Sequence, residues 1–384
     1  MDSVLIVAAE ASSSLYAQRL LEHWQAEGRE VHAFGIGSRP MEKLGFECVG
    51  RSEEMAVVGL QEVIKHFPLI RKVFHGLVEE AKKRKPKLAL LLDYPDFNLR
   101  LAKKLKALGI PVIYYISPQV WAWRTGRVKL IKRVVDHMLV LFPFEEPFYR
   151  EHGVRVDFVG HPLLDELPPT LSEKDFLFEK QKFGLGPDEL VLGLMPGSRH
   201  SEIHHHLRTQ LEAAAIVMRR MPNVRPVLMV APTLERSDFQ EQLADFPFPI
   251  QIIKDSPLKM ISLADVMLVA SGTATLMVGL MEKPMVIMYR MNAVTAWLAK
   301  KLVTKTRFFG MANLIMGRAV VPELFQEEAN PERLAAELLR FLDDPEERKR
   351  VRSELALIKE KLGNKGATAN VARILEEYFR SSAG

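Results

Sequence analysis

The sequence contains a single cysteine, Cys48, and no apolar run as long as the roughly 20 residues that cross a bilayer. One thiol excludes an intramolecular disulfide and any metal site built from several thiolates, and it favours a reducing compartment. The first residues, Met1–Ala8, lack the basic segment of a signal peptide, so we expect them to form a strand. These absences together predict a cytoplasmic protein.

The chain also has little net charge. Its 384 residues carry a formal charge of +5, which is too small for a chain of this size to imply a nucleic-acid partner. This charge is compatible with an anionic membrane surface or with anionic substrates. A hydrophobic content of 48% and a charged content of 26% are typical of a soluble globular protein, and the length suits two domains.

Short apolar runs alternate with amphipathic segments along the chain, a pattern that predicts an α/β fold with parallel sheets. The expected strands are 4–8, 30–34, 88–92, 111–116, 137–141, 156–159, 191–195, 227–230, 250–253, 266–270 and 285–288. The expected helices include 17–27, 98–108, 202–220, 331–342 and 346–379, the last broken at Gly363.

The domain boundary is expected at Pro168 and Pro169, because two prolines cannot continue a helix or a central strand. We therefore predict one Rossmann-like domain over residues 1–167 and a second over 168–355, the two facing a cleft. Helices within 356–384 are expected to pack back on the first domain.

Two buried strands in the second half each run into a turn of small residues that opens a helix. The first turn is Pro196-Gly197-Ser198-Arg199, and the second begins at Ser271-Gly272-Thr273. Free amides at such a helix start, with the positive end of the helix dipole, bind phosphate oxygens. Arg199 adds a positive charge, so the pair of turns predicts a phosphorylated ligand, for which a nucleoside diphosphate is the natural candidate.

In the first half, Asp93 follows the expected strand at 88–92. A carboxylate at the carboxyl end of a buried strand faces the crevice in which open α/β sheets bind ligands, which makes Asp93 a candidate general base. Capping of the helix that begins near Phe97 is the alternative role. That role is favoured for Asp96, whereas for Asp93 both remain open.

Several segments together resemble the lipid-A-disaccharide synthase family, nearly along the whole chain and in the family's order. They are Asp93-Tyr-Pro-Asp-Phe-Asn98, Tyr115-Ile-Ser-Pro-Gln-Val-Trp-Ala-Trp-Arg124, Leu141-Phe-Pro-Phe-Glu145, Gly160-His-Pro162, Pro196-Gly-Ser-Arg199, Ser271-Gly-Thr-Ala274 and Asn313-Leu-Ile-Met-Gly-Arg318. The resemblance implies an inverting glycosyltransferase of the two-Rossmann, GT-B type. Such enzymes join UDP-2,3-diacylglucosamine to 2,3-diacylglucosamine 1-phosphate, and they form a β-1,6-linked disaccharide and UDP.

The resemblance also implies roles for individual residues. Asp93 matches the family's proposed base, and Arg199 would neutralise the diphosphate without a metal or other cofactor, in agreement with the lack of an Asp-x-Asp motif. Glu10 joins these two in the expected catalytic set. The expected nucleotide ligands are Gly197, Ser198, Arg199, Ser271, Gly272, Thr273, Asn313 and Gln326. The expected acceptor and lipid residues, in the first domain, are Ser12, Asn98, Trp123, Phe67 and Phe74.

Two departures from the family pattern bear on binding. The family usually carries Gly-Glu-x-Ser-Gly-Asp after the first strand, whereas this chain has Ser13 and Ser14 at the last two of those positions. In the second domain, Met277 stands where a glutamate would hold the ribose hydroxyls. Because a thioether accepts hydrogen bonds poorly, the departure at Met277 predicts altered or weaker UDP binding.

Other conspicuous segments allow two interpretations each. Trp121 and Trp123 are expected in a core or cleft wall rather than on a nucleic-acid surface, and the tract 204–206 of three histidines is expected on a solvated helix face because adjacent side chains on a helix diverge. His161 suits a ligand contact or a structural role equally. Tyr289 and Arg290 suit a ligand-binding edge or ordinary surface.

Membrane contact is expected from an amphipathic segment. The stripe of apolar residues in 62–82, flanked by basic residues, fits a core-facing helix or a membrane-facing surface, and 297–309 is a second candidate. We expect a cytoplasmic enzyme held peripherally at the inner membrane, and a homodimer is compatible with the sequence. The competing functions are another UDP-sugar enzyme, such as a UDP-N-acetylglucosamine 2-epimerase or the muramyl glycosyltransferase, and a non-catalytic UDP-sugar- or lipid-binding relative.

Overall fold

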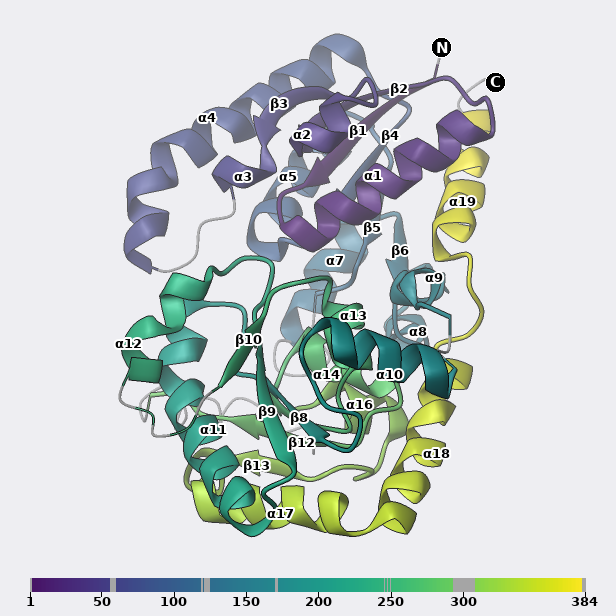
Figure 1. Ribbon diagram of the computed structural model, residues 1–384. Helices are drawn as coiled ribbons and strands as arrows, with labels where there is room; N and C mark the ends of the chain where they lie inside the picture. Colours follow the sequence, from purple (N-terminus) through teal and green to yellow (C-terminus); the bar gives the residue numbers. More distant parts are fainter. Residues whose placement is uncertain are drawn as a thin grey trace. The chain divides into compact units, whose positions relative to one another are not determined.

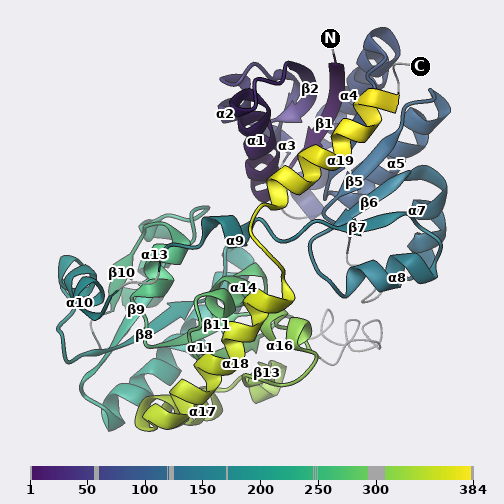
Figure 2. The same cartoon turned by 90° about the vertical axis from the view of Figure 1, so that its right-hand side faces the viewer.

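In the computed structural model, two parallel β-sheets organise the chain (Figures 1 and 2). The structure describes residues 2–55, 60–118, 120, 125–169, 172–244, 246, 248, 250–292 and 308–381. Unit 1 consists of Met1–Asp165 and Leu362–Gly384, and unit 2 consists of Glu166–Lys361. The chain therefore leaves unit 1, forms unit 2, and returns.

Unit 1 contains a seven-stranded sheet in the order β3-β2-β1-β4-β5-β6-β7, in which every pair of neighbours is parallel. Its strands are β1 Asp2–Ala8, β2 Val31–Gly37, β3 Glu47–Arg51, β4 Leu88–Leu92, β5 Val112–Tyr115, β6 His137–Val140 and β7 Val156–Phe158. Its helices are α1 Ala11–Ala26, α2 Arg39–Glu42, α3 Ser52–Met55, α4 Leu60–Arg84, α5 Pro95–Ala107, α7 Val128–Val134, α8 Glu145–Glu151 and α19 Ala367–Ser381, and α9 Leu163–Glu166 lies at the boundary with unit 2.

Alternate residues of each central strand enter two different cores of unit 1, because successive strand side chains point to opposite faces. Leu5 and Val7 pack in the core that is covered by α4, α5 and α7. Val4, Ile6 and Ala8 pack in the core that is covered by α1 and α19. Helices on both faces explain why strands such as β4 are apolar throughout rather than alternating.

The last helix, α19, lies beside the first, α1, in the second of these cores (Figure 1). Val371, Leu375 and Phe379 of α19 are buried there, and the Phe379 ring meets Trp24 of α1 edge-on at 6.0 Å between centroids. Unit 1 is thus closed by residues from both ends of the chain.

Unit 2 contains a six-stranded parallel sheet in the order β10-β9-β8-β11-β12-β13. Its strands are β8 Leu190–Met195, β9 Val224–Met229, β10 Gln251–Ile253, β11 Val266–Ala270, β12 Met285–Tyr289 and β13 Glu323–Phe325. Its helices are α10 Glu173–Lys182, α11 His200–Arg220, α12 Gln240–Ala244, α13 Pro257–Ser262, α14 Thr273–Leu280, α16 Met311–Met316, α17 Pro331–Asp343 and α18 Pro345–Lys361. Helix α17 packs on α11, and α18 packs on α14 and α16 (Figure 2).

Each sheet has one point at which the strand order reverses. In unit 1 this topological switch point lies between β1 and β4, and in unit 2 it lies between β8 and β11. Ligands of open α/β sheets bind outside the carboxyl ends of the strands at such points. Two parallel-sheet α/β units confirm the predicted fold class. Within the described residues, no helix is long and apolar enough to cross a membrane.

Candidate active site

Asp93 and Glu10 lie at the switch point of unit 1. Asp93 directly follows β4, and Glu10 follows the neighbouring strand β1, whose Ala8 is paired in register with Leu92. The helix after Asp93 begins at Pro95 with Tyr94 at its N-cap position. The expected capping by Asp96 is therefore wrong: Asp96 is exposed and forms an ion pair with Arg127 at 2.5 Å.

The Asp93 carboxyl has the electrostatics of a general base near neutral pH. Its pKa is raised from 3.8 to about 6, chiefly by burial and also by the negative charge of Glu10, against a backbone hydrogen bond from Tyr94 that lowers it. A carboxyl with this pKa is ionised at neutral pH, yet it is a much better proton acceptor than an ordinary aspartate.

The two serines that depart from the family pattern stabilise the start of α1. Ser13 accepts a hydrogen bond from the Glu10 amide at 3.0 Å and donates to the Glu10 carbonyl at 2.9 Å. The buried Ser14 hydroxyl donates to the Ala8 carbonyl at 2.9 Å. Ser13 and Ser14 thus hold the β1–α1 turn that carries Glu10, while Ser12 is exposed beside them.

Asn98 is fully buried below the Asp93 turn. Its side-chain nitrogen donates to the carbonyls of Leu92 at 3.1 Å and of Asp93 at 2.8 Å. The other expected acceptor residues differ in exposure: Phe74 is partly buried against the core and meets Phe97 edge-on, whereas Phe67 is 56% exposed. Trp123 lies outside the described residues.

In unit 2, the turn Pro196–Arg199 follows β8 at the switch point and opens α11. Gly197 has a φ of +137°, and a Cβ there would come within 2.5 Å of the Glu202 side chain. That carboxylate accepts a hydrogen bond from the Ser198 amide at 2.8 Å. Arg199 is exposed at the N-cap of α11. An acidic side chain therefore accepts from the Ser198 amide, which the sequence pattern assigned to phosphate.

The second turn follows β11, next to the first. Gly272 is the N-cap of α14 with a φ of +151°, and no atom lies within 4 Å of a Cβ built on it. No side chain caps this helix, and Thr273 is exposed. The first amides of α14 therefore remain available to an anion.

Asn313 orders the backbone beside Ser271. Its buried amide accepts from the amides of Val320 and Val321 and donates to the Glu323 carboxylate at 2.8 Å. Glu323 in turn accepts from the Phe309 amide at 2.7 Å, and the Ser271 hydroxyl donates to the Phe309 carbonyl at 2.9 Å. Nucleotide binding by Asn313 stays a prediction, but its amide already has these backbone and carboxylate partners.

Gln326 holds the segment that follows β12. Its amide accepts from the Met291 N–H at 3.0 Å and donates to the Met291 carbonyl at 3.1 Å. Gln326 itself has a φ of +53°, a left-handed conformation that is uncommon outside glycine. Its contact with nucleotide likewise stays a prediction.

His206 connects the turn before α11 with the segment that follows β12. Its expected place on a solvated helix face is wrong. It is fully buried, and a ring protonated at Nδ1 donates to the Pro196 carbonyl at 2.8 Å and accepts from the Arg290 amide at 3.0 Å. Burial lowers its pKa, so it is neutral at physiological pH. The periodicity of α11 contained the signal, because His206 falls in line with the buried Ile203, Gln210 and Ala213.

Tyr289 belongs to the same group of side chains. Burial raises the pKa of its hydroxyl, the Glu202 carboxylate raises it further, and Arg199 lowers it. The Tyr289 ring lies beside the His206 ring, with 5.3 Å between centroids. Arg290 donates to the Thr209 hydroxyl at 2.8 Å. The sequence left open whether Tyr289 lies at a ligand-binding edge or on ordinary surface.

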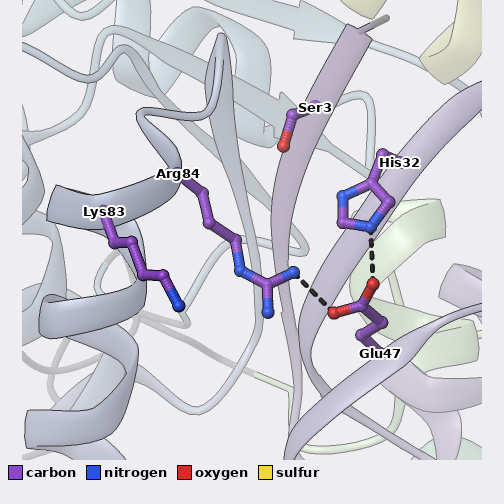
Figure 3. A pocket seen from close by; sticks show the side chains of 5 residues that line it. All are labelled: Ser3, His32, Glu47, Lys83 and Arg84. Atoms are coloured by element: carbon purple, nitrogen blue, oxygen red, sulfur yellow. Dashed lines mark hydrogen bonds and ion pairs between the residues drawn. The ribbon is translucent and has the colours of Figure 1, made fainter.

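A pocket lies at the opposite, amino-terminal edge of the unit 1 sheet (Figure 3). It has a volume of about 490 Å³ and is lined by Ser3, His32, Glu47, Lys83 and Arg84. Glu47 is paired with both His32 and Arg84 at 2.6 Å. Within the described ranges, no three His, Cys, Asp or Glu side chains are grouped as metal ligands would be.

A family model described as lipid-A-disaccharide synthetase matches residues 4–375. The chain belongs to this family. A lipid-A-disaccharide synthase of Geobacter metallireducens is 43% identical over 376 residues, which are 98% of this chain and 97% of the relative. Another, of Myxococcus xanthus, is 40% identical with the same coverage of both chains.

Solved structures share the family's GT-B fold. A UDP-GlcNAc 2-epimerase from Neisseria meningitidis has a TM-score of 0.64 at 12% identity, with 98% of this chain and 99% of that chain covered. Acinetobacter baumannii MurG has a TM-score of 0.58 at 15% identity, with coverages of 98% and 100%. The fold alone is therefore common to both alternative enzymes, and the sequence identity along the chain selects the lipid-A-disaccharide synthase family.

Proposed function

We propose that this chain joins UDP-2,3-diacylglucosamine to 2,3-diacylglucosamine 1-phosphate, giving the β-1,6-linked disaccharide 1-phosphate and UDP. The observation that carries the proposal is Asp93, a partly buried carboxyl at a switch point with a pKa raised to about 6. A non-catalytic relative would have no use for such a group. Arg199 at the N-cap of α11 and the uncapped start of α14 support the nucleotide part of the proposal.

The reaction follows from these groups. The Asp93 carboxylate takes the proton of the acceptor 6-hydroxyl as its oxygen attacks the anomeric carbon of the donor. The bond from that carbon to the UDP oxygen breaks on the opposite face, so the configuration inverts and UDP leaves with the bonding electrons. Arg199 and the amides of Gly197, Ser198 and Thr273 stabilise the charge that develops on the diphosphate. In this scheme the Glu202 carboxylate must leave the Ser198 amide when UDP binds.

Incubation of the purified protein with both substrates tests the proposal, with the disaccharide detected by mass spectrometry. Formation of the disaccharide with release of UDP supports it. UDP release without disaccharide would favour a different acceptor, and conversion of UDP-N-acetylglucosamine to its C2 epimer would favour the epimerase function instead.

Met277 provides a test of ribose binding. It is half-buried on α14, beyond the intact Ser271–Thr273 turn. If a carboxylate at this position holds the ribose hydroxyls, Met277→Glu should tighten UDP binding by about 1.5–3 kcal/mol at most, the value of one hydrogen bond to a charged group. Calorimetric titration with UDP measures this, and Met281→Glu, one turn further along, is the control for added charge. Unchanged affinity in both variants would mean that other residues hold the ribose.

We further propose that the protein acts at the cytoplasmic surface of the inner membrane, with α4 in contact with the lipid. Most of the apolar stripe of this helix is used by the core, since Val73, Leu77 and Ala81 are buried. Phe67 instead is 56% exposed near the exposed Arg71 and Lys72. An exposed aromatic beside cations suits an anionic lipid surface.

Sedimentation with anionic phosphatidylglycerol vesicles tests this contact. Phe67→Glu should weaken vesicle binding roughly tenfold or more, because insertion of a phenylalanine is worth about 1.5–3 kcal/mol. Phe178→Glu is the matched control, since Phe178 is 57% exposed on α10 of unit 2. Equal losses in the two variants would assign the effect to charge alone and remove α4 from the proposed contact.

A further inference from the structure

The turn that carries Asp93 has an unusual backbone. Asp93 and Tyr94 both adopt left-handed conformations, with φ values of +49° and +45°. Such conformations are unfavourable for residues with a Cβ and usually occur singly. Two in succession persist only where surrounding contacts hold them.

Two buried side chains supply those contacts at one atom. The carbonyl oxygen of Asp93 accepts a hydrogen bond from the Tyr114 hydroxyl at 2.5 Å and another from the Asn98 side-chain nitrogen at 2.8 Å. Tyr114 lies on the adjacent strand β5, and both side chains are fully buried. The Asp93 amide also donates to the Tyr115 carbonyl at 3.1 Å, so the peptide groups on both sides of Asp93 are fixed.

We propose that Tyr114 and Asn98 are positioning residues, which hold the Asp93 turn in its left-handed conformation and so aim the carboxylate at the acceptor hydroxyl. This inference rests on the proposed role of Asp93 as the base. Neither side chain needs to touch substrate, because both act on the backbone oxygen of the residue that does.

The same turn sets the surroundings of the carboxylate. The charged and titratable groups that act on it are Glu10 from the β1–α1 turn and Tyr114 from β5, and the Tyr94 backbone amide donates to it. Burial is the larger cause of the raised pKa of Asp93, and Glu10 adds to it. If the turn relaxed, the carboxylate would gain water, and its pKa would fall toward the ordinary value for aspartate.

Tyr114→Phe tests the inference, because it removes one hydroxyl and keeps the ring. Tyr115→Phe is the matched control: it is the next residue, it is also buried, and it points into the opposite core. For Tyr114→Phe we expect kcat to fall roughly tenfold to a hundredfold with little change in KM. The acid limb of the kcat profile should move to lower pH, while the Kd for UDP stays unchanged. Tyr115→Phe should leave both kcat and the acid limb of its pH profile unchanged.

The outcomes separate this inference from the proposed function. Near wild-type activity in Asp93→Asn would reject both the role of Asp93 as the base and the positioning role of Tyr114 and Asn98. If Asp93→Asn is inactive, two results for Tyr114→Phe would reject the positioning role alone. One is a normal kcat, and the other is a reduced kcat whose pH profile keeps its acid limb at the wild-type pH. If Tyr114→Phe does not fold, Asn98→Ser removes the other donor to the same oxygen, and the same expectations and contradictions apply to it.

Discussion

Replacing Asp93 with asparagine is expected to lower the rate of glycosyl transfer by roughly 10²- to 10⁴-fold, the contribution of a positioned general base. UDP binding should stay unchanged, because Asp93 belongs to unit 1 and the proposed phosphate contacts belong to unit 2. In the wild-type protein, the rate should fall as the pH drops through about 6, the pKa to which burial and Glu10 raise the carboxyl. Single-turnover rates and UDP titrations measure these effects.

The same substitution should stabilise the folded protein. Because the pKa of Asp93 is raised from 3.8 to about 6, the folded state binds more protons than the unfolded state between these values. Stability therefore falls as pH rises through this window, and the cost of the buried charge persists above it. Asp93→Asn should raise the free energy of unfolding by roughly 1–3 kcal/mol at about pH 8 and add little at about pH 4.

An inactive Asp93→Asn protein that is less stable than wild type at high pH would contradict this account, because its loss of activity could then arise from misfolding. Activity close to wild type would remove Asp93 from the role of base. The combination of lost rate, gained stability and unchanged UDP affinity is specific to a partly buried catalytic carboxyl whose pKa is raised.

Arg199→Ala is expected to lose transfer activity and UDP affinity together. A charge-assisted contact to the diphosphate acts in the bound substrate as well as in the transition state, and it is worth about 1.5–3 kcal/mol, or roughly tenfold to 150-fold in Kd. Arg208→Ala is the matched control, because Arg208 lies on the same helix with its side chain 86% exposed. Addition of magnesium or EDTA should change the rates little.

Wild-type UDP affinity in Arg199→Ala would place the diphosphate elsewhere in unit 2. Strong inhibition by EDTA that a divalent ion reverses would show that a cation shares the neutralising role assigned to Arg199.

The sequence predicted the fold well where strands are central and apolar. Strands such as β4 and β11 are buried along their whole length, so their composition alone identifies them. The edge strands β3 and β13 escaped prediction because neither forms an apolar run: β3 contains Glu47, Gly50 and Arg51, and the three residues of β13 begin with Glu323.

The candidate site divides in a similar way. Asp93 and the two small-residue turns could be predicted, because their signal is local: a strand followed by a carboxylate or by glycine. The parts played by His206 and Tyr114 could not, because each acts on the backbone of a residue distant in sequence. Identifying such partners requires the strand order, which periodicity does not contain.

The return of α19 to unit 1 has a consequence for how the protein is made. Trp24 and its neighbours on α1 pack in part on β1 and in part on α19, and α19 is synthesised only after the whole of unit 2. During translation, the part of the α1 face that α19 covers stays exposed while unit 2 is being made. Unit 1 can complete its core only after α19 has been synthesised, so we expect a chain truncated before α19 to expose apolar surface and to be degraded by proteolytic quality control.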